Sequence, residues 1–300
     1  MHRASFAVRL FARRNRRSDP DRGGSNLECR LEPERRVRSR VPAAAFSSIL
    51  MLAAGCVAPG ERSATLAGVR FDHCVVFAED AALQEWLEVH LTNAEALETR
   101  HEGQGTRGRY FLFLNSFLEV LTLEDAAEAA SNEDAFGSPY VPRWRDDHAA
   151  PIAFGLTLDS DSFASPPFDH VRYRGNEDGG GYVMAKGNVD LAAPLVYATG
   201  PARAYRRRTS MEELRNIEDA SRREEVRRYL THPCGVRTLT HVTWRAPGSG
   251  VRGPNADLLR SFPEVTLEPG AGHELILEFD HAAAGQELRF EGRPSVVLRF

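Results

Sequence analysis

Lysine is almost absent from this chain of 300 residues, because Lys186 is the only lysine among 38 basic residues and the rest are arginine. Cysteine is also scarce: there are four cysteines, irregularly spaced, and no two of them form a CxxC pair. That spacing excludes the common zinc-ribbon and thiol redox motifs. The chain also has no P-loop spacing around its lysine and no GxSxG motif, which excludes two familiar phosphate-binding and hydrolase signatures. The remaining composition, 42% hydrophobic and 27% charged, is that of a globular protein.

The charge is distributed unevenly along the chain. Residues 1–40 contain twelve arginines and five acidic residues, although the whole chain has a net charge of −4. The rest of the chain is therefore clearly acidic and would repel a phosphate backbone. We expect no nucleic-acid partner.

A short basic and then apolar segment precedes the acidic part of the chain. Residues Val37–Cys56 read VRSRVPAAAFSSILMLAAGC, a layout typical of a secretory signal, and the ending AAGC resembles a bacterial lipoprotein signal that is lipidated on Cys56. The apolar part is too short to span a membrane comfortably. This predicts a protein of the bacterial cell envelope, lipid-anchored or periplasmic. The alternative is a cytoplasmic protein in which Ala43–Ala54 forms a helix within a loose leader.

The Arg-rich residues 1–36 stand in front of this signal, where none is expected, so we interpret them as a leader that is not translated if Val37 is the true start. Val57–Gly68 then fits a flexible linker between a lipid anchor and the domain that follows.

The domain begins at Val69. Val69–Ala78 predicts a strand, and Leu83, Trp86, Leu87 and His90 have the spacing of one face of a helix. Two apolar runs on either side of Asn115 and Ser116 then predict a β-hairpin. Further along, Ser210–Leu230 predicts a helix that starts with a capping box of Ser210 and Glu213.

Several segments together resemble a known superfamily. These are FDH on the first strand, HxGQGT from His101, FLEVL from Phe117, and later segments as far as RPSVVLRF at the C-terminus. They resemble uncharacterised bacterial glyoxalase-like proteins of the vicinal oxygen chelate superfamily. The resemblance implies an α+β fold in which βαβββ modules form a curled mixed sheet around a cavity, with an additional C-terminal αβ segment. It covers residues 69–300, with a first module at about 69–125 and a second module and C-terminal strands at about 150–300.

A His and a Glu in the first module match positions that bind a divalent metal in that superfamily. Alternation places His73 on one strand face with Phe71, Val75 and Phe77, and Glu119 on another with Phe117, Leu121 and Leu123. A carboxylate on an apolar face needs a partner or a cation.

The second module lacks the matching pair, since neither PIAFGLTL nor PLVYATG carries a His or a carboxylate. His241 and Glu278 could take their place, giving a hypothetical metal set of His73, Glu119, His241 and Glu278. The alternative is that His73 and Glu119 form a hydrogen-bonded pair in the cavity.

The GQGT turn is a second candidate site. Gly105 would allow a ligand to approach the backbone, and Thr106, Arg107 and Arg109 could bind an anionic group of a substrate. His101 at its entrance could act as an acid or a base beside Glu119. The alternative is a tight connection in which the glycines serve only the backbone geometry.

Three functions are compatible with these patterns. The first is a metal-dependent lyase, isomerase or dioxygenase acting on a small oxygenated substrate. The second is a metal-free protein of the cell envelope that binds or sequesters a small molecule, and the third is a structural protein of the envelope. The missing second ligand pair favours binding, whereas His73, Glu119 and His101 favour an enzyme. Modules of this superfamily pair within or between chains, which leaves a homodimer open.

Overall fold

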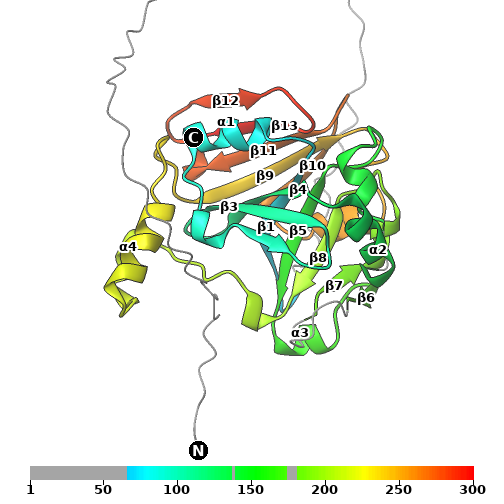
Figure 1. Ribbon diagram of the computed structural model, residues 1–300, viewed down its shortest axis with the longest axis horizontal. Helices are drawn as coiled ribbons and strands as arrows, with labels where there is room; N and C mark the ends of the chain where they lie inside the picture. Colours follow the sequence, from blue (N-terminus) through cyan, green and yellow to red (C-terminus); the bar gives the residue numbers. More distant parts are fainter. Residues whose placement is uncertain (1–65, 137–138, 174–180) are drawn as a thin grey trace, which may run out of the picture. The chain divides into compact units, whose positions relative to one another are not determined.

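The computed structural model describes residues 66–136, 139–173 and 181–300, and their strands form two mixed sheets (Figure 1). One sheet has eight strands in the order β2-β3-β4-β1-β5-β8-β7-β6, and the other has five in the order β10-β9-β11-β13-β12. The predicted α+β class is confirmed. The predicted curling is not found, because within these ranges neither sheet closes or curls strongly.

The first half of the larger sheet is a βαβββ unit. Its first strand pairs in parallel with its last strand, and the two middle strands form an antiparallel extension from there. The predicted strand, helix and hairpin lie here. The elements are β1 (Val69–Ala78), α1 (Ala82–His90), η1 (Glu95–Leu97), β2 (Thr99–His101), β3 (Thr106–Leu112) and β4 (Phe117–Leu123).

The second half repeats this order of elements. It joins the first half through an antiparallel pairing of β1 with β5, and its own first and last strands are again parallel neighbours. The elements are β5 (Ile152–Leu158), α3 (Ser160–Ala164), β6 (His170–Arg172), β7 (Val183–Ala185) and β8 (Leu195–Thr199).

The five-stranded sheet repeats the central strand arrangement of the larger sheet. Its two central strands, β9 and β11, are antiparallel, and each has a parallel neighbour on its outer side, β10 and β13 respectively. The elements are β9 (Leu239–Ala246), α5 (Pro254–Leu259), β10 (Val265–Pro269), β11 (Glu274–Phe279), η6 (Asp280–Ala282), β12 (Glu287–Phe290) and β13 (Ser295–Arg299).

The remaining helices lie in the connections between strands, and the segment with η5 and α4 corrects a sequence prediction. In place of a continuous helix over Ser210–Leu230, the chain has two helical pieces, and Ser210 makes no capping hydrogen bond. Asp219 caps the second piece instead, accepting a hydrogen bond from the Arg222 amide. The connecting elements are α2 (Ala126–Phe136), η2 (Val141–Trp144), η3 (Lys186–Val189), η4 (Pro201–Arg203), η5 (Met211–Asn216) and α4 (Ala220–Tyr229).

The largest apolar core contains side chains of both sheets and of α1. It covers one face of the eight-stranded sheet, and a smaller cluster with Val75, Phe77 and Trp144 lies on the other face. Alternation predicts that Phe71 shares a face with Val75 and Phe77, but Phe71 belongs instead to the large core on the other face. The reason is a β-bulge between Phe71 and His73, which shifts the alternation of β1.

The proposed leader, signal, lipidation site Cys56 and most of the linker, residues 1–65, lie outside the described residues. Among the helices that the structure describes, none has the length and apolar character required to cross a bilayer.

Candidate functional site

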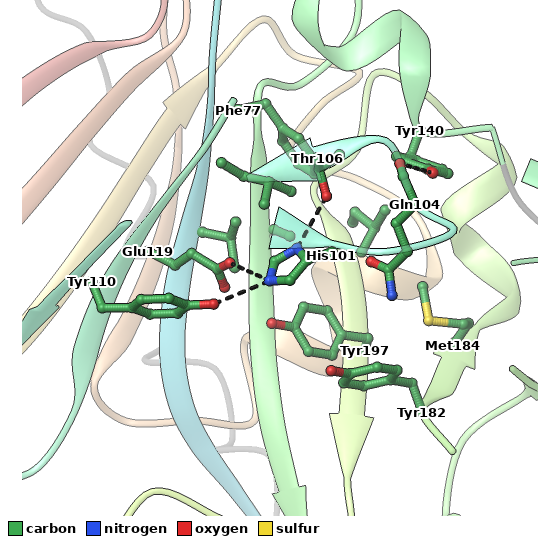
Figure 2. Close-up of a pocket in the computed structure, with 14 residues that line it drawn as sticks. Phe77, His101, Gln104, Thr106, Tyr110, Glu119, Tyr140, Tyr182, Met184 and Tyr197 are labelled. Carbon is green, nitrogen blue, oxygen red and sulfur yellow. Dashed lines mark hydrogen bonds and ion pairs between the residues drawn. The ribbon is translucent and has the colours of Figure 1, made fainter. Parts of the chain in front are cut away.

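A cavity lies on the face of the eight-stranded sheet that is opposite the large core (Figure 2). Its interior volume is about 110 Å³, below the roughly 300–1,000 Å³ of most small-molecule sites, so the cavity suits only a small ligand. Both βαβββ units contribute side chains to its wall. The lining residues are Val75, Phe77, His101, Gln104, Thr106, Tyr110, Glu119, Leu121, Tyr140, Ala153, Tyr182, Met184, Leu195 and Tyr197.

Strand alternation explains most of this wall. On β8, Leu195 and Tyr197 face the cavity while Val196 lies in the large core. On β4, Glu119 and Leu121 face it together, as their spacing predicts.

His101 lies at the centre of the polar part of the wall. Its Nδ1 is 3.0 Å from the Thr106 hydroxyl, and its Nε2 is 3.2 Å from the Tyr110 hydroxyl. The same Nε2 is 3.9 Å from a carboxylate oxygen of Glu119. The His101 side chain keeps 21% of its surface exposed, so a ligand in the cavity can reach the ring. This places an acid–base group beside a carboxylate.

Glu119 depends on a glycine in the neighbouring strand. A Cβ at Gly108 would lie 2.5 Å from a Glu119 carboxylate oxygen and 2.7 Å from the Tyr110 hydroxyl. Glycine therefore leaves the space over β3 in which these two groups approach one another.

His73 lies behind the cavity wall and does not line it. Its Nδ1 is 2.9 Å from the Asp72 carboxylate, and its Nε2 is 2.5 Å from the Tyr197 hydroxyl, which does face the cavity. The His73 ring stacks on Phe117 at 3.9 Å. His73 thus fixes the direction of the Tyr197 hydroxyl and connects it to a buried carboxylate.

The bulge in β1 makes this arrangement possible, since it lets the consecutive residues Asp72 and His73 contact one another on the same side of the strand. Burial alone would raise the pKa of Asp72, but hydrogen bonds from His73, Thr157 and the Tyr205 amide outweigh it and lower this pKa.

Three tyrosines of the wall are held in their neutral form. Burial, and then the negative charge of Glu119, raise the pKa of Tyr110 and of Tyr197. Burial also raises the pKa of Tyr182, which Arg203 opposes and Glu119 reinforces. These phenols can donate or accept hydrogen bonds but add no charge to the cavity.

The four residues of the hypothetical metal set do not come together. His73 and Glu119 belong to the eight-stranded sheet, whereas His241 and Glu278 pair with one another in the five-stranded sheet. His241 there contacts the Thr266 hydroxyl at 2.8 Å. Both ring nitrogens of His73 are already occupied by Asp72 and Tyr197. No group of three or more His, Cys, Asp or Glu side chains in the described ranges could hold a metal ion, so these residues do not fit a resident divalent metal.

The GQGT turn contributes Thr106 to the cavity but not its arginines. Alternation along β3 directs Arg107 and Arg109 to the opposite face, where they pair with Glu124, Glu98 and Glu88. Gly105 has a φ of +64°, and a Cβ there would lie 2.1 Å from the Asp125 carbonyl. Its own carbonyl accepts hydrogen bonds from the amides of Glu124 and Asp125. In this turn, Gly105 serves the backbone.

The sequence reasoning missed the tyrosines and Asp72. Tyr197 could have been found, because it is two residues after Leu195 in PLVYATG and shares a face with it on a strand of the second module. Tyr110 likewise lies four residues after Thr106 on one strand face. Asp72 gave no such signal, since regular alternation would direct it away from His73.

Comparisons with known proteins add only distant similarity. No protein-family model matches the chain, and no curated protein does. The chain is similar in structure to a hypothetical protein from Staphylococcus aureus, at 10% sequence identity and a TM-score of 0.43, over 77% of this chain and 99% of that one.

It is also similar to a xylose isomerase-like TIM barrel/4-hydroxyphenylpyruvate dioxygenase fusion protein, at 12% identity and a TM-score of 0.35. That match covers 74% of this chain and 38% of the fusion protein. Similarity at this distance supports no statement about ligand or activity, so function has to be argued from the side chains of the chain itself.

Proposed function

We propose that this chain is a glyoxalase-like cavity protein that binds a small organic molecule on the open face of its eight-stranded sheet, without a resident metal. The observation that supports the proposal is the composition of the cavity wall. Apolar and aromatic side chains of both βαβββ units surround a few converging polar groups, the usual composition of a small-molecule site. A purely structural role would not require a buried carboxylate in an open cavity.

A cavity-filling variant tests this proposal. Ala153 lies in the wall on β5, and Ala153→Leu would add three carbon atoms to the space that a ligand needs. In a thermal-shift screen of small organic molecules, we expect compounds that raise the Tm of the wild-type protein to have no effect on Ala153→Leu. Ala284→Leu, at an exposed alanine outside the cavity, is the matched control and should respond like the wild type. Compounds that stabilise all three proteins equally would show that the cavity is not the site.

Removal of metal ions gives an independent check. Because the described side chains do not form a metal-binding group, we expect dialysis against EDTA to leave the Tm and the ligand affinity unchanged. Metal analysis of protein purified without chelators should then find far less than one ion per chain. A stoichiometry near one, with a Tm that falls in EDTA, would contradict the metal-free proposal.

Acid–base catalysis on the bound molecule is a second candidate, favoured by the position of His101. The ring is held by Thr106 and Tyr110, is partly open to the cavity and lies 3.9 Å from Glu119. His101 could move a proton at a carbon or oxygen atom of the ligand, and Glu119 would stabilise the protonated form of the His101 ring. Once a ligand is known, wild-type protein and His101→Gln should bind it similarly. Only the wild type should catalyse exchange of the acidic protons of the ligand with deuterium from the solvent. Equal exchange by both proteins would exclude this role.

A further inference from the structure

The charge of the cavity wall indicates which class of ligand it accepts, provided that the cavity binds a small molecule as proposed above. Glu119 is the one acidic side chain among the described lining residues, and none of those residues is Arg or Lys. The Glu119 side chain is only 9% exposed, and the nearest basic atom is Nε2 of His101 at 3.9 Å. A buried carboxylate of this kind is stabilised most by a positive charge placed in the cavity.

The phenols of the wall favour the same charge. Because Tyr110 and Tyr197 have pKa values raised by burial and by the charge of Glu119, they stay neutral and offer oxygen lone pairs. The Nδ1 of His73 faces the Asp72 carboxylate, so in the neutral ring Nε2 accepts the Tyr197 proton. The Tyr197 oxygen is then available to the cavity as an acceptor.

The aromatic rings form a corner that suits an ammonium group. The rings of Tyr182 and Tyr197 lie 5.5 Å apart between centroids and are nearly perpendicular, at 86° (Figure 2). A cation in such a corner contacts electron-rich ring surface, and a nearby carboxylate strengthens the attraction. Tyr182 already attracts one cation, since the Arg203 guanidinium lies 5.5 Å from its ring centroid, although Arg203 does not line the cavity.

The two arginines that follow the GQGT turn, which were expected to bind an anion, do not line the cavity. Arg107 and Arg109 face away from the cavity and are paired with glutamates on the opposite side of the sheet. We propose that the cavity selects an organic cation, a molecule with a substituted ammonium group that packs against Tyr182 and Tyr197 and is paired with Glu119.

Three probes of almost the same shape test the charge preference directly: choline, the uncharged 3,3-dimethylbutan-1-ol and the anionic 3,3-dimethylbutanoate. Binding to the whole protein is measured by NMR titration. We expect choline to bind roughly tenfold more tightly than the alcohol, and the anion to bind most weakly.

In Glu119→Gln the preference for choline over the alcohol should fall to about threefold or less, whereas Glu291→Gln, at an exposed glutamate, should keep it. If Glu119→Gln does not fold, Tyr182→Leu replaces it, because loss of the ring face should weaken choline binding and leave the alcohol unchanged.

The result separates this inference from the proposed function. If the alcohol or the anion binds as tightly as choline, and Ala153→Leu abolishes that binding, the cavity is a ligand site but not one for cations. An undiminished preference for choline in Glu119→Gln would also overturn the inference. If none of the three probes binds, both the cation inference and the cavity as the site for such molecules fall.

Discussion

Asp72 and His73 depend on a glycine in the adjacent strand. The His73 ring occupies the space above Gly155, and a Cβ at that position would lie 2.2 Å from the ring. The ring cannot easily move away, because it is hydrogen-bonded to Asp72 and Tyr197 and stacks on Phe117. The φ angle of Gly155 is not in the left-handed region, so the requirement for glycine at this position is one of space.

We therefore predict that Gly155→Ala lowers the free energy of unfolding by about 1–3 kcal/mol, the usual cost of overpacking a buried site. Urea denaturation measures this change. Gly272→Ala is the control, since nothing lies within 4 Å of a Cβ there, and it should stay within about 0.5 kcal/mol of the wild type. Equal stability of the two variants would mean that the His73 ring is not held above Gly155.

His232 is a buried histidine that is held neutral by its surroundings. Nδ1 of His232 accepts a hydrogen bond from the Thr92 amide at 2.9 Å, and Nε2 donates one to the Leu112 carbonyl at 2.9 Å. Burial lowers the pKa of His232 to about 4. Protonation would put a second donor against the Thr92 amide, so the folded state resists it.

This pKa predicts a loss of stability in mild acid. The unfolded chain takes up a proton at His232 below about pH 6.5, whereas the folded chain does so only near pH 4. The contribution is therefore complete above pH 6.5 and is lost as the pH falls towards 4, by at most about 3 kcal/mol. Urea midpoints between pH 7 and 4 should fall less steeply in His232→Gln. His148→Gln, at an exposed histidine, should follow the wild type, and parallel curves for all three proteins would contradict the prediction.

At the scale of elements, a buried arginine fixes the position of η2 beside the larger sheet. Arg143 is fully buried, and its guanidinium donates to the carbonyls of Ala150, Ala193 and Asn188 at 2.8 to 3.3 Å. Burial lowers its pKa to about 9, and the negative charge of Asp190 opposes this shift only in part. One planar fork thus serves carbonyls from two separate connections, the one before β5 and the one between β7 and β8.

Arg143→Lys should be poorly tolerated, because a single ammonium group cannot reach carbonyls that diverge around a guanidinium. We expect a loss of about 2–4 kcal/mol in the free energy of unfolding, measured in urea. The neighbouring Arg145→Lys, at an exposed side chain, should have little effect. If both lysine variants have the stability of the wild type, the carbonyls around Arg143 do not depend on its fork.

Sequence patterns predicted elements well where periodicity was strong, and failed where one contact decides the outcome. The strand, helix and hairpin of the first unit lie where expected, because apolar spacing of 2 or 3.6 residues determines which face is buried. The break before Asp219 was missed since its carboxylate competes as a cap within a helical pattern. Nor does sequence distinguish Arg143 from Arg145, because its burial depends on contacts with residues about fifty positions later.

The candidate site was predicted in part for the same reason. Strand alternation predicts the direction of Glu119, and the GQGT turn draws attention to His101 and Thr106 on either side of it. All three side chains line the cavity. The bulge in β1 moves His73 behind the wall, and only the register with β5 reveals it. The arrangement of two sheets likewise separates His241 from Glu119, which strand spacing within one segment cannot show.

At the scale of the molecule, the two sheets share a single core. The described strands and helices, from β1 to β13, all belong to one compact unit. The ring of Phe113, in the β3–β4 hairpin, and the ring of Phe279, at the end of β11, lie 4.7 Å apart between centroids. Asn115 in the β3–β4 hairpin both donates to the Leu239 carbonyl and accepts from its amide. These contacts join the hairpin of the first unit directly to β9, the first strand of the five-stranded sheet (Figure 1).

Such an interface predicts that the sheets unfold together. Separation of the two sheets would expose the large apolar core that both of them cover, at a cost of roughly 25 cal/mol for each Å² of apolar surface. Neither sheet is therefore expected to open alone. Native-state hydrogen exchange over a urea series measures this. The central amides of β5 and β11 should converge on the same opening free energy, within about 1 kcal/mol, while those of the edge strand β12 exchange earlier. A separate, lower isotherm for all of β9, β11 and β13 would instead make the five-stranded sheet an independent folding unit, and the contacts of Phe113 and Asn115 would then be only a docking surface.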